Sequence, residues 1–454
     1  MALVSKIDSF GDIAVWSFLS QFFMLAVAML LGNTLRRKIP VIRKSLVPTS
    51  LLGGALILIL KAIPAFESFV NYAAMETVTY HCLAIGFIAV ALKRVQSKQK
   101  GSIKTLLETG IVQGATYAMQ ASLGLIVTIT LALTLANGFF PGGGVLLALG
   151  FGQGTGQALN YGKLYETSYG FEGGATFGLT IATVGFFVAS IVGVIYMNIL
   201  RKQGKLRLMR NEGEKVEEKL EDYVTDNEIP STESVDRLTL NISLVLSVYA
   251  VTYIIMRVAD VKLVWGFNFL LGSLLALLFK VCMNKMKKIG WMHRDIVNDH
   301  LMDRISGFAF DFMIIAGCAA INLEKVYNLL WPLIIICAVG TAATFAYLRW
   351  VSYHLYPGYE HEAFLSLFGM LTGTASNGMI LLREIDPTYE TPAATNLVLS
   401  GVPAIVFGGG LLLVLGYCPQ GMKQAIITLV ILVVAVVVFT AILFRQKIFK
   451  KKAK

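Results

Sequence analysis

Eleven long apolar runs divide this chain of 454 residues, and they constrain its fold more than any other feature. A transmembrane helix needs about 20 mostly apolar residues, and each run meets or approaches that length. Apolar residues make up 56% of the chain and charged residues 15%, so a soluble protein of this composition would expose large apolar patches. We therefore predict an all-α polytopic membrane protein with about 11 transmembrane helices. The runs are 14–32, 47–64, 77–92, 107–136, 173–200, 239–258, 264–282, 306–323, 328–350, 393–416 and 422–444.

The positive charges predict the orientation of these spans. The net charge is +11, but most Lys and Arg residues lie between apolar runs, which is typical of cytoplasmic loops and does not indicate nucleic-acid binding. The first run is too long for a signal peptide and is followed by a basic cluster at 36–38. With eleven spans, an outside N-terminus and a cytoplasmic C-terminus, 32 of the 39 Lys and Arg residues fall in cytoplasmic segments. We expect a multi-pass protein of the bacterial inner membrane.

Two further apolar segments are too rich in Gly, Thr, Ser and Asn to be ordinary spans. They are FPGGGVLLALGFGQGTGQALNYG at 140–162 and AFLSLFGMLTGTASNGMI at 363–380. Irregular backbone at membrane depth persists only where protein buries it or water reaches it. We interpret both segments as re-entrant hairpins, the first starting from outside and the second from inside.

The order of spans and hairpins predicts two inverted-topology repeats. Residues 1–200 form the first repeat, 201–238 a charged cytoplasmic linker, 239–416 the second repeat, and 417–454 an extra C-terminal helix with a basic tail. Each repeat contains five crossings and one hairpin, so the second starts on the opposite side of the membrane. The motif GFGQGT (150–155) aligns with GMLTGT (369–374), which matches Gly154 with Gly373 and Thr155 with Thr374.

Broken helices within such repeats are typical of transporters. Their free N–H groups attract anions, and their free carbonyls replace the water around a small cation. The alternative interpretations are tight helix crossing through small residues and an ordinary surface loop. The substrate-binding candidates on the first hairpin are Gln153, Gly154, Thr155, Gly156, Gln157 and Asn160. Those on the second are Thr374, Ala375, Ser376 and Asn377. The backbone candidates for Na⁺ are Gly152 and Gly373.

Asp311, inside the run FAFDFMIIAG, is the remaining candidate for a cation site. An intramembrane carboxylate is costly, so it is expected to bind Na⁺ or carry a proton, or else to lie near the inner interface, paired with Arg304 or capped by hydroxyls. Gln113 and Gln120 are expected to form hydrogen bonds across helices. The chain has no GxSxG motif and only one candidate intramembrane Asp, so we predict that it is not an enzyme, and the five cysteines suggest no metal site.

The first hairpin resembles that of a known transporter family. GFGQGTGQALNYGKLYETSYGF (150–171) is similar to the first re-entrant loop of the bacterial glutamate:sodium symporter (ESS) family. VPTSLLGGALILIL (47–60) resembles an early helix of that family, and GTASNGMILLREID (373–386) lies where its second Gly-rich loop is found. The departures are Phe151 and Leu371 at expected glycines, Asp311 at an expected small hydroxyl residue, and the extra last span.

The resemblance implies a secondary transporter that takes up L-glutamate or a related small anionic substrate. It further implies Na⁺ as the coupling ion, no other cofactor, a homodimer in the lipid bilayer, and an elevator-like movement of a hairpin-bearing core. Transport of another organic acid or amino acid, coupled to Na⁺ or to H⁺ through Asp311, remains an alternative. A channel or a substrate sensor is a third possibility.

Overall fold

The computed structural model describes residues 13–93, 103–134, 139–205, 236–259, 265, 268–290, 296–386 and 390–450, and no strand occurs among them. The linker 206–235 and both extreme termini lie outside the described residues, so the predictions for them stay predictions. The elements are α1 (Ile13–Lys38), α2 (Pro40–Lys44), α3 (Thr49–Lys61), α4 (Pro64–Glu67), α5 (Tyr72–Leu92), α6 (Ile103–Leu133), η1 (Pro141–Val145), α7 (Leu146–Tyr169), α8 (Gly174–Lys202), α10 (Arg237–Ala259), α12 (Asn268–Lys288), α13 (Asp299–Ala319), α14 (Leu323–Asn328), α15 (Leu330–Leu355), α16 (Glu360–Thr372), α17 (Ala375–Ile385), α18 (Ala393–Leu399), α19 (Gly401–Tyr417), η2 (Cys418–Gln420) and α20 (Met422–Lys450).

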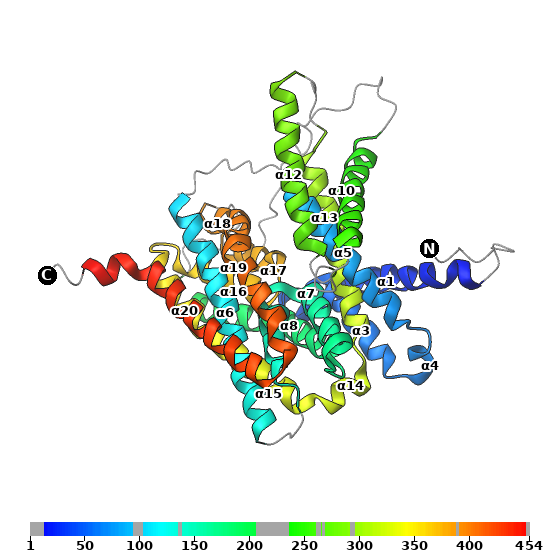
Figure 1. Cartoon of the computed structure of the whole chain (residues 1–454), viewed down its shortest axis with the longest axis horizontal. Helices are drawn as coiled ribbons and strands as arrows, with labels where there is room; N and C mark the ends of the chain where they lie inside the picture. Colours follow the sequence, from blue (N-terminus) through cyan, green and yellow to red (C-terminus); the bar gives the residue numbers. More distant parts are fainter. Residues whose placement is uncertain are drawn as a thin grey trace.

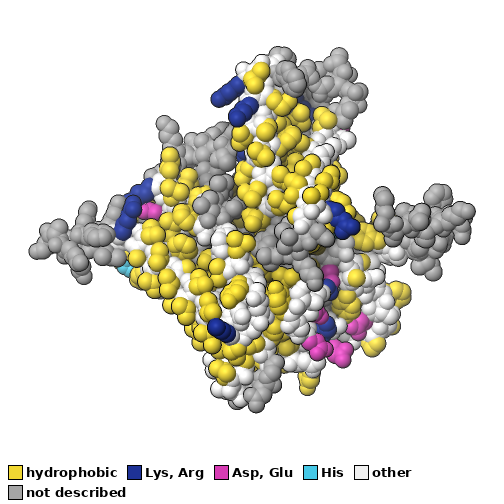
Figure 2. Space-filling model, in the orientation of Figure 1, with side chains coloured by type: hydrophobic (Ala, Val, Ile, Leu, Met, Phe, Trp, Pro, Cys, Tyr) yellow, Lys and Arg dark blue, Asp and Glu magenta, His cyan; other side chains and the backbone are white. Residues whose placement is uncertain are grey.

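The predicted class, an all-α polytopic membrane protein, is confirmed. Eight of the described helices are long and apolar enough to span a membrane: α1, α5, α6, α8, α10, α12, α15 and α20. The other three predicted runs form α3, which has 13 residues, the more polar α13, and the pair α18 and α19, which is divided at Ser400. Only 17% of the most apolar window of α20 is buried, so most of this helix faces lipid. Hydrophobic side chains cover much of the visible surface in Figure 2.

The helices surround a central pair, α7 and α8. In Figure 1, α6, α15, α19 and α20 lie on one side of this pair, and α1, α3, α5, α10, α12 and α13 lie on the other. Small residues permit the close approaches, as at Gly32 of α1, where a Cβ atom would lie 2.8 Å from the Thr49 carbonyl of α3. Every element in the centre therefore contacts other protein elements on several sides, whereas the outer helices expose apolar faces to lipid.

The segment 139–171, named hairpin 1, folds back on itself. Phe140, before η1, stacks on Phe171, after α7, with ring centroids 4.7 Å apart. The chain reverses between them at Gly154, where the backbone leaves helical geometry. α7 then ends at Gly170 in the left-handed conformation, which glycine adopts without steric cost. The two ends of hairpin 1 thus lie together at one end of the bundle.

Residues 360–385, named hairpin 2, form a second reversal. α16 ends at Thr372, α17 begins at Ala375, and the two helices pack closely through their small residues. A Cβ atom on Gly369 of α16 would lie 2.8 Å from the Gly378 backbone of α17. Both glycine-rich segments are therefore helix–break–helix structures.

α8 packs along both hairpins, one on each half of its length. Near its start, Gly178 packs against Ala158 of hairpin 1, and near its end Gly193 packs against Leu381 of hairpin 2. Between them, Gly185 has neighbours from both hairpins. The hairpins therefore approach one another along α8 from opposite ends and meet near its middle.

Gly124 of α6 and Gly144 of η1 approach so closely that neither position has room for a side chain. A Cβ atom built on either glycine would overlap the carbonyl group of the other. We expect Gly144→Ala to destabilise the protein by about 1–3 kcal/mol, the usual cost of overpacking. Thermal unfolding of the purified protein would measure the loss. The control is Gly307→Ala, because a Cβ atom there has no neighbour within 4 Å. Equal stability of both variants would contradict the close approach.

Candidate functional site

The break in hairpin 1 depends on the glycine at position 154. Gly154 has φ 79° and ψ −170°, a conformation that is essentially restricted to glycine. Residues 146–153 form the first arm of α7, and residues 155–169 form the second arm. The carbonyl end of the first arm and the N–H end of the second arm therefore both lie at this break.

The break in hairpin 2 is formed by Gly373 and Thr374. A Cβ atom on Gly373 would lie 2.5 Å from the Asn377 Nδ2 atom and 3.0 Å from the Gly369 carbonyl, so any side chain here would require Asn377 to move. Thr374 is the N-cap of α17, and its Oγ1 atom accepts a hydrogen bond from the Asn377 backbone N–H at 3.5 Å. This second break has the same polarity as the first: one helix ends there and another begins.

The two breaks lie in contact. A Cβ atom built on Gly154 would lie 3.7 Å from the Thr374 Cγ2 atom and 3.8 Å from the Gly373 carbonyl oxygen. Phe186 of α8 lies at the same distance from that Cβ position as Thr374, 3.7 Å. The two motifs that align in the sequence are thus brought together near the middle of a membrane-spanning helix.

The electrostatics of this junction favour a small anion together with a small cation. The second arm of α7 and α17 both begin here, and their N-terminal N–H groups carry partial positive charge. The first arm of α7 and α16 both end here, and their carbonyls are suited to binding a hard cation. Residues 150–160 and 371–378 contain no charged side chain, so these backbone groups dominate the local field.

Two buried amides that closely follow the breaks lack full hydrogen bonding. Gln157 is only 1% exposed, and neither its Oε1 nor its Nε2 atom has a partner among the described residues. Asn377 is 3% exposed, and its Nδ2 atom likewise lacks a partner. Each amide lies three residues after a break. Because buried polar atoms are nearly always satisfied, these atoms are available to bind a polar ligand or an ordered water molecule.

The predicted site residues divide into buried and more accessible groups. The buried ones are Gly152, Gly154, Thr155, Gly156, Gln157, Asn160, Gly373 and Asn377, and the partly or fully exposed ones are Gln153, Thr374, Ala375 and Ser376. Thr155 lies against α13, with its Oγ1 atom 3.5 Å from the Met313 carbonyl. The accessible residues lie at the two breaks or directly beside them, so access to the junction is from the tips.

The structure does not bring Asp311 to the junction. Its side chain is exposed and lies beside Ser50 of α3. Met313 and Gly317, which contact Thr155, lie about 200° and 240° around α13 from Asp311 at 100° per residue. Asp311 therefore occupies a different face of α13.

Gln120 of α6 belongs to the surroundings of the junction. Its Nε2 atom donates hydrogen bonds to the Thr344 Oγ1 atom at 3.0 Å and the Leu371 carbonyl at 2.8 Å. Gln113, seven residues earlier, donates to the Ser400 Oγ atom at 2.6 Å. The predicted hydrogen bonds across helices are thus confirmed. A spacing of seven residues places both side chains on one face of α6.

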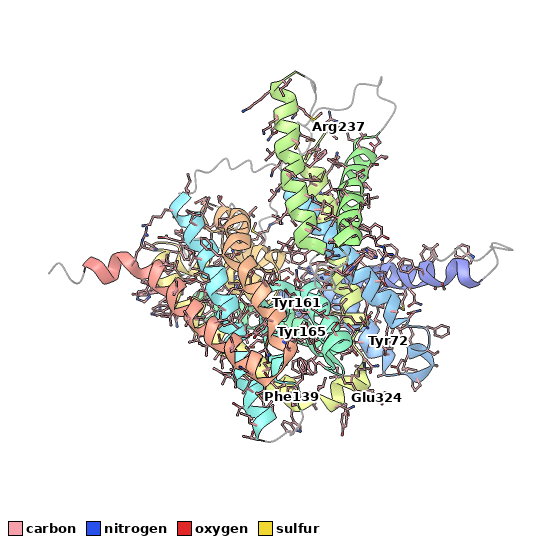
Figure 3. The ribbon with its side chains drawn as sticks, viewed as in Figure 1. Tyr72, Phe139, Tyr161, Tyr165, Arg237 and Glu324 are labelled. Atoms are coloured by element: carbon pink, nitrogen blue, oxygen red, sulfur yellow. The ribbon has the colours of Figure 1, made fainter. Side chains whose placement is uncertain are left out.

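Tyrosines attach the second arm of hairpin 1 to α19. The Tyr161 hydroxyl donates to the Leu412 carbonyl at 2.9 Å, and the Tyr165 hydroxyl donates to the Leu415 carbonyl at 2.5 Å. Both tyrosines lie in the centre of Figure 3. These contacts could not be predicted from the sequence, because they depend on the packing of two helices that are far apart in the chain.

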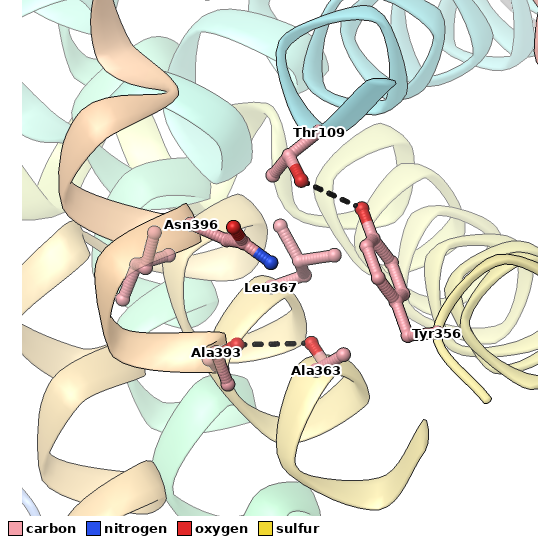
Figure 4. A pocket seen from close by; sticks show the side chains of 8 residues that line it. Thr109, Tyr356, Ala363, Leu367, Ala393 and Asn396 are labelled. Atoms are coloured by element: carbon pink, nitrogen blue, oxygen red, sulfur yellow. Dashed lines mark hydrogen bonds between the residues drawn. The ribbon is translucent and has the colours of Figure 1, made fainter. Parts of the chain in front are cut away.

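A small cavity lies behind hairpin 2, between α6, α16 and α18. Its volume of about 10 Å³ is close to that of one water probe. Figure 4 shows Thr109 and Tyr356 at its edge, with their hydroxyl oxygens 2.9 Å apart. This space is too small for an organic substrate.

Comparison with protein families agrees with this architecture. The model of the sodium/glutamate symporter family matches residues 16–377, which include most of α1, the break in hairpin 1 and the break in hairpin 2. A symporter family implies a transporter rather than an enzyme. The comparison with curated proteins gives no match. Because the family match extends over most of the chain and contains both breaks, the chain belongs to the sodium/glutamate symporter family.

Proposed function

We propose that this chain is a secondary active transporter that takes up L-glutamate, or a related small anionic substrate, together with Na⁺ at the junction of the two hairpins. The observation that carries the proposal is the pair of incompletely bonded amides, Gln157 and Asn377, each three residues after one of the two contacting breaks. Membership in a symporter family supplies the coupling ion and the substrate class.

The carboxylates of the substrate would bind to the N–H groups at the start of the second arm of α7 and of α17. Helix N-termini are ready anion sites, and amide side chains add directional donors and acceptors. The substrate-binding residues are then Gln153, Gly154, Thr155, Gly156, Gln157, Asn160, Thr374, Ala375, Ser376 and Asn377.

Na⁺ would bind to backbone carbonyls at the ends of the first arm of α7 and of α16, near Gly152 and Gly373. These carbonyls end their helices beside the anion site, so a bound cation and a bound carboxylate would stabilise one another. Asp311 faces away from this junction. It is therefore the weaker candidate for Na⁺, and coupling to H⁺ through Asp311 is the alternative mechanism.

We propose alternating access by an elevator-like movement within a homodimer, in the bacterial inner membrane. The support is the family resemblance, together with two hairpins that approach from opposite ends of α8, as inverted repeats at 1–200 and 239–416 would require. In that arrangement the hairpins are re-entrant, and 417–454 adds a helix outside the repeats.

Uptake into proteoliposomes tests the proposed function. We expect labelled L-glutamate to accumulate when an inward Na⁺ gradient is imposed, and not when choline replaces Na⁺. Competition with other amino acids and organic acids would define the substrate. Full uptake without Na⁺ would contradict Na⁺ coupling. Uptake driven by a pH gradient alone would also contradict it, and would favour H⁺ coupling through Asp311.

A further inference from the structure

A lysine is buried at the end of α3. Lys61 is 1% exposed, and its Nζ atom donates hydrogen bonds to the Ala319 carbonyl at 2.9 Å and the Ile321 carbonyl at 2.5 Å. The same atom lies 4.1 Å from the centre of the Tyr72 ring. A buried ammonium group is costly without such partners. Because both carbonyls lie at the C-terminal end of α13, where the helix dipole is negative, Lys61 acts as the cap of that helix.

Lys280 of α12 makes the corresponding contact with α5. Its Nζ atom donates to the Ala91 and Lys93 carbonyls, both at 3.1 Å. α5 ends at Leu92, so these carbonyls also belong to the C-terminal end of a helix. In both cases one ammonium group binds two carbonyls that are two residues apart.

The sequence places the two lysines at equivalent positions. TSLLGGALILILK (49–61) and NFLLGSLLALLFK (268–280) share six of their 13 residues, including the final lysine. The shift of 219 residues that aligns these helices also aligns GFGQGT (150–155) with GMLTGT (369–374), which contain the two breaks. Lys61 and Lys280 thus have the same position relative to the break in their own half, and each binds a helix of the other half.

The two capped helices form the wall behind the second arm of hairpin 1. On α13, a Cβ atom at Gly317 would lie 2.7 Å from the Thr155 Cβ atom. On α5, the Leu83 Cδ1 atom lies 2.5 Å from the place of a Cβ atom on Gly156. Neither glycine position has room for a side chain, so α13 and α5 pack closely against hairpin 1, and an axial shift of either helix would displace the first turn after the break.

We propose that Lys61 and Lys280 are a repeat-related pair of positioning residues, which hold α13 and α5 at the depth that the transport site requires. The inference rests on the proposed function, because it takes the junction of the hairpins as that site. Neither lysine contacts the substrate or Na⁺. Both act through the helices that support Thr155 and Gly156.

Replacement of each lysine by methionine tests this pair, with Lys104→Met as the matched control. Lys104 is 56% exposed and pairs with Glu108 on its own helix at 3.7 Å, so its replacement removes the same charge from an exposed position. We expect Lys61→Met to raise the half-saturating Na⁺ and glutamate concentrations about tenfold, as for a site whose support is loosened. Lys280→Met should have a smaller effect, because Lys280 is less buried. Lys104→Met should leave both values unchanged.

Hydrogen–deuterium exchange provides a second measurement that needs no transport. Lys61→Met should accelerate exchange at 316–323, the capped end of α13, and also at 151–158, the tip of hairpin 1. Faster exchange at 316–323 alone, with only the maximal uptake reduced, would show a purely structural cap and overturn the proposal. A further outcome is that the wild-type protein shows no Na⁺-driven uptake while Lys61→Met still accelerates exchange at 151–158. That result would contradict the proposed function but support the coupling of Lys61 to the tip of hairpin 1. If Lys61→Met does not fold, Lys280→Met tests the proposal instead. Exchange is then compared at 88–93, the capped end of α5, and at 151–158.

Discussion

Gly154→Ala is expected to reduce Na⁺-driven glutamate uptake about tenfold or more while the protein remains folded. The backbone at Gly154 has φ 79° and ψ −170°, which costs an alanine about 1–3 kcal/mol. The new methyl group itself has room, because its nearest neighbours are 3.7 Å away. The cost therefore falls on the conformation of the break and disturbs the two helix ends that meet there. Initial uptake rates in proteoliposomes, normalised to folded protein, would measure the effect.

The control for this variant is Gly409→Ala in α19. Gly409 lies within a helix, and a Cβ atom there has no neighbour within 4 Å, so alanine should be neutral or slightly stabilising. Wild-type uptake by Gly154→Ala would mean that the break is not required for transport. Equal loss of uptake in both variants would indicate a general sensitivity to alanine and not a local one.

Gln157→Leu is expected to make the protein more stable and to abolish saturable uptake. The wild-type amide is buried without partners, which destabilises the folded protein by about 1–3 kcal/mol. Replacement by an apolar group of similar size removes this cost. If that amide binds the substrate, the same change removes the binding interaction. The unfolding temperature without ligands would measure the gain in stability. The rise in that temperature when Na⁺ and glutamate are added would measure the loss of binding.

Gln21→Leu is the matched control, since Gln21 is also buried but fully bonded. It donates to the Phe69 carbonyl at 2.7 Å and accepts from the Asn71 N–H at 2.9 Å. Its replacement leaves two backbone groups without partners, so we expect lower stability and an unchanged half-saturating glutamate concentration. A destabilised Gln157→Leu protein with wild-type uptake would show that Gln157 has a structural role.

The local elements of the site could be predicted from the sequence, but their mutual contacts could not. A run of Gly, Thr and Asn within an apolar segment predicts a broken helix, because such residues favour caps and turns over helix interiors. Asp311 is a candidate cation ligand from the sequence, since a carboxylate in an apolar run is costly wherever it lies. Its position on a different face of α13 from the residues that contact Thr155 depends on how α13 is rotated against its neighbours. Sequence spacing alone does not define that rotation.

The sequence by itself determined that the chain is an all-α membrane protein, that two glycine-rich segments interrupt its spans, and that Gly154 and Gly373 are equivalent. Those properties follow from composition and from local backbone preferences. Only the tertiary structure decided that the two breaks meet beside α8, that Gln157 and Asn377 are buried without full hydrogen bonding, and that Lys61 and Lys280 cap helices of the opposite half. These features are contacts between residues that are tens to hundreds of positions apart. They depend on the packing of whole helices, which no local pattern specifies.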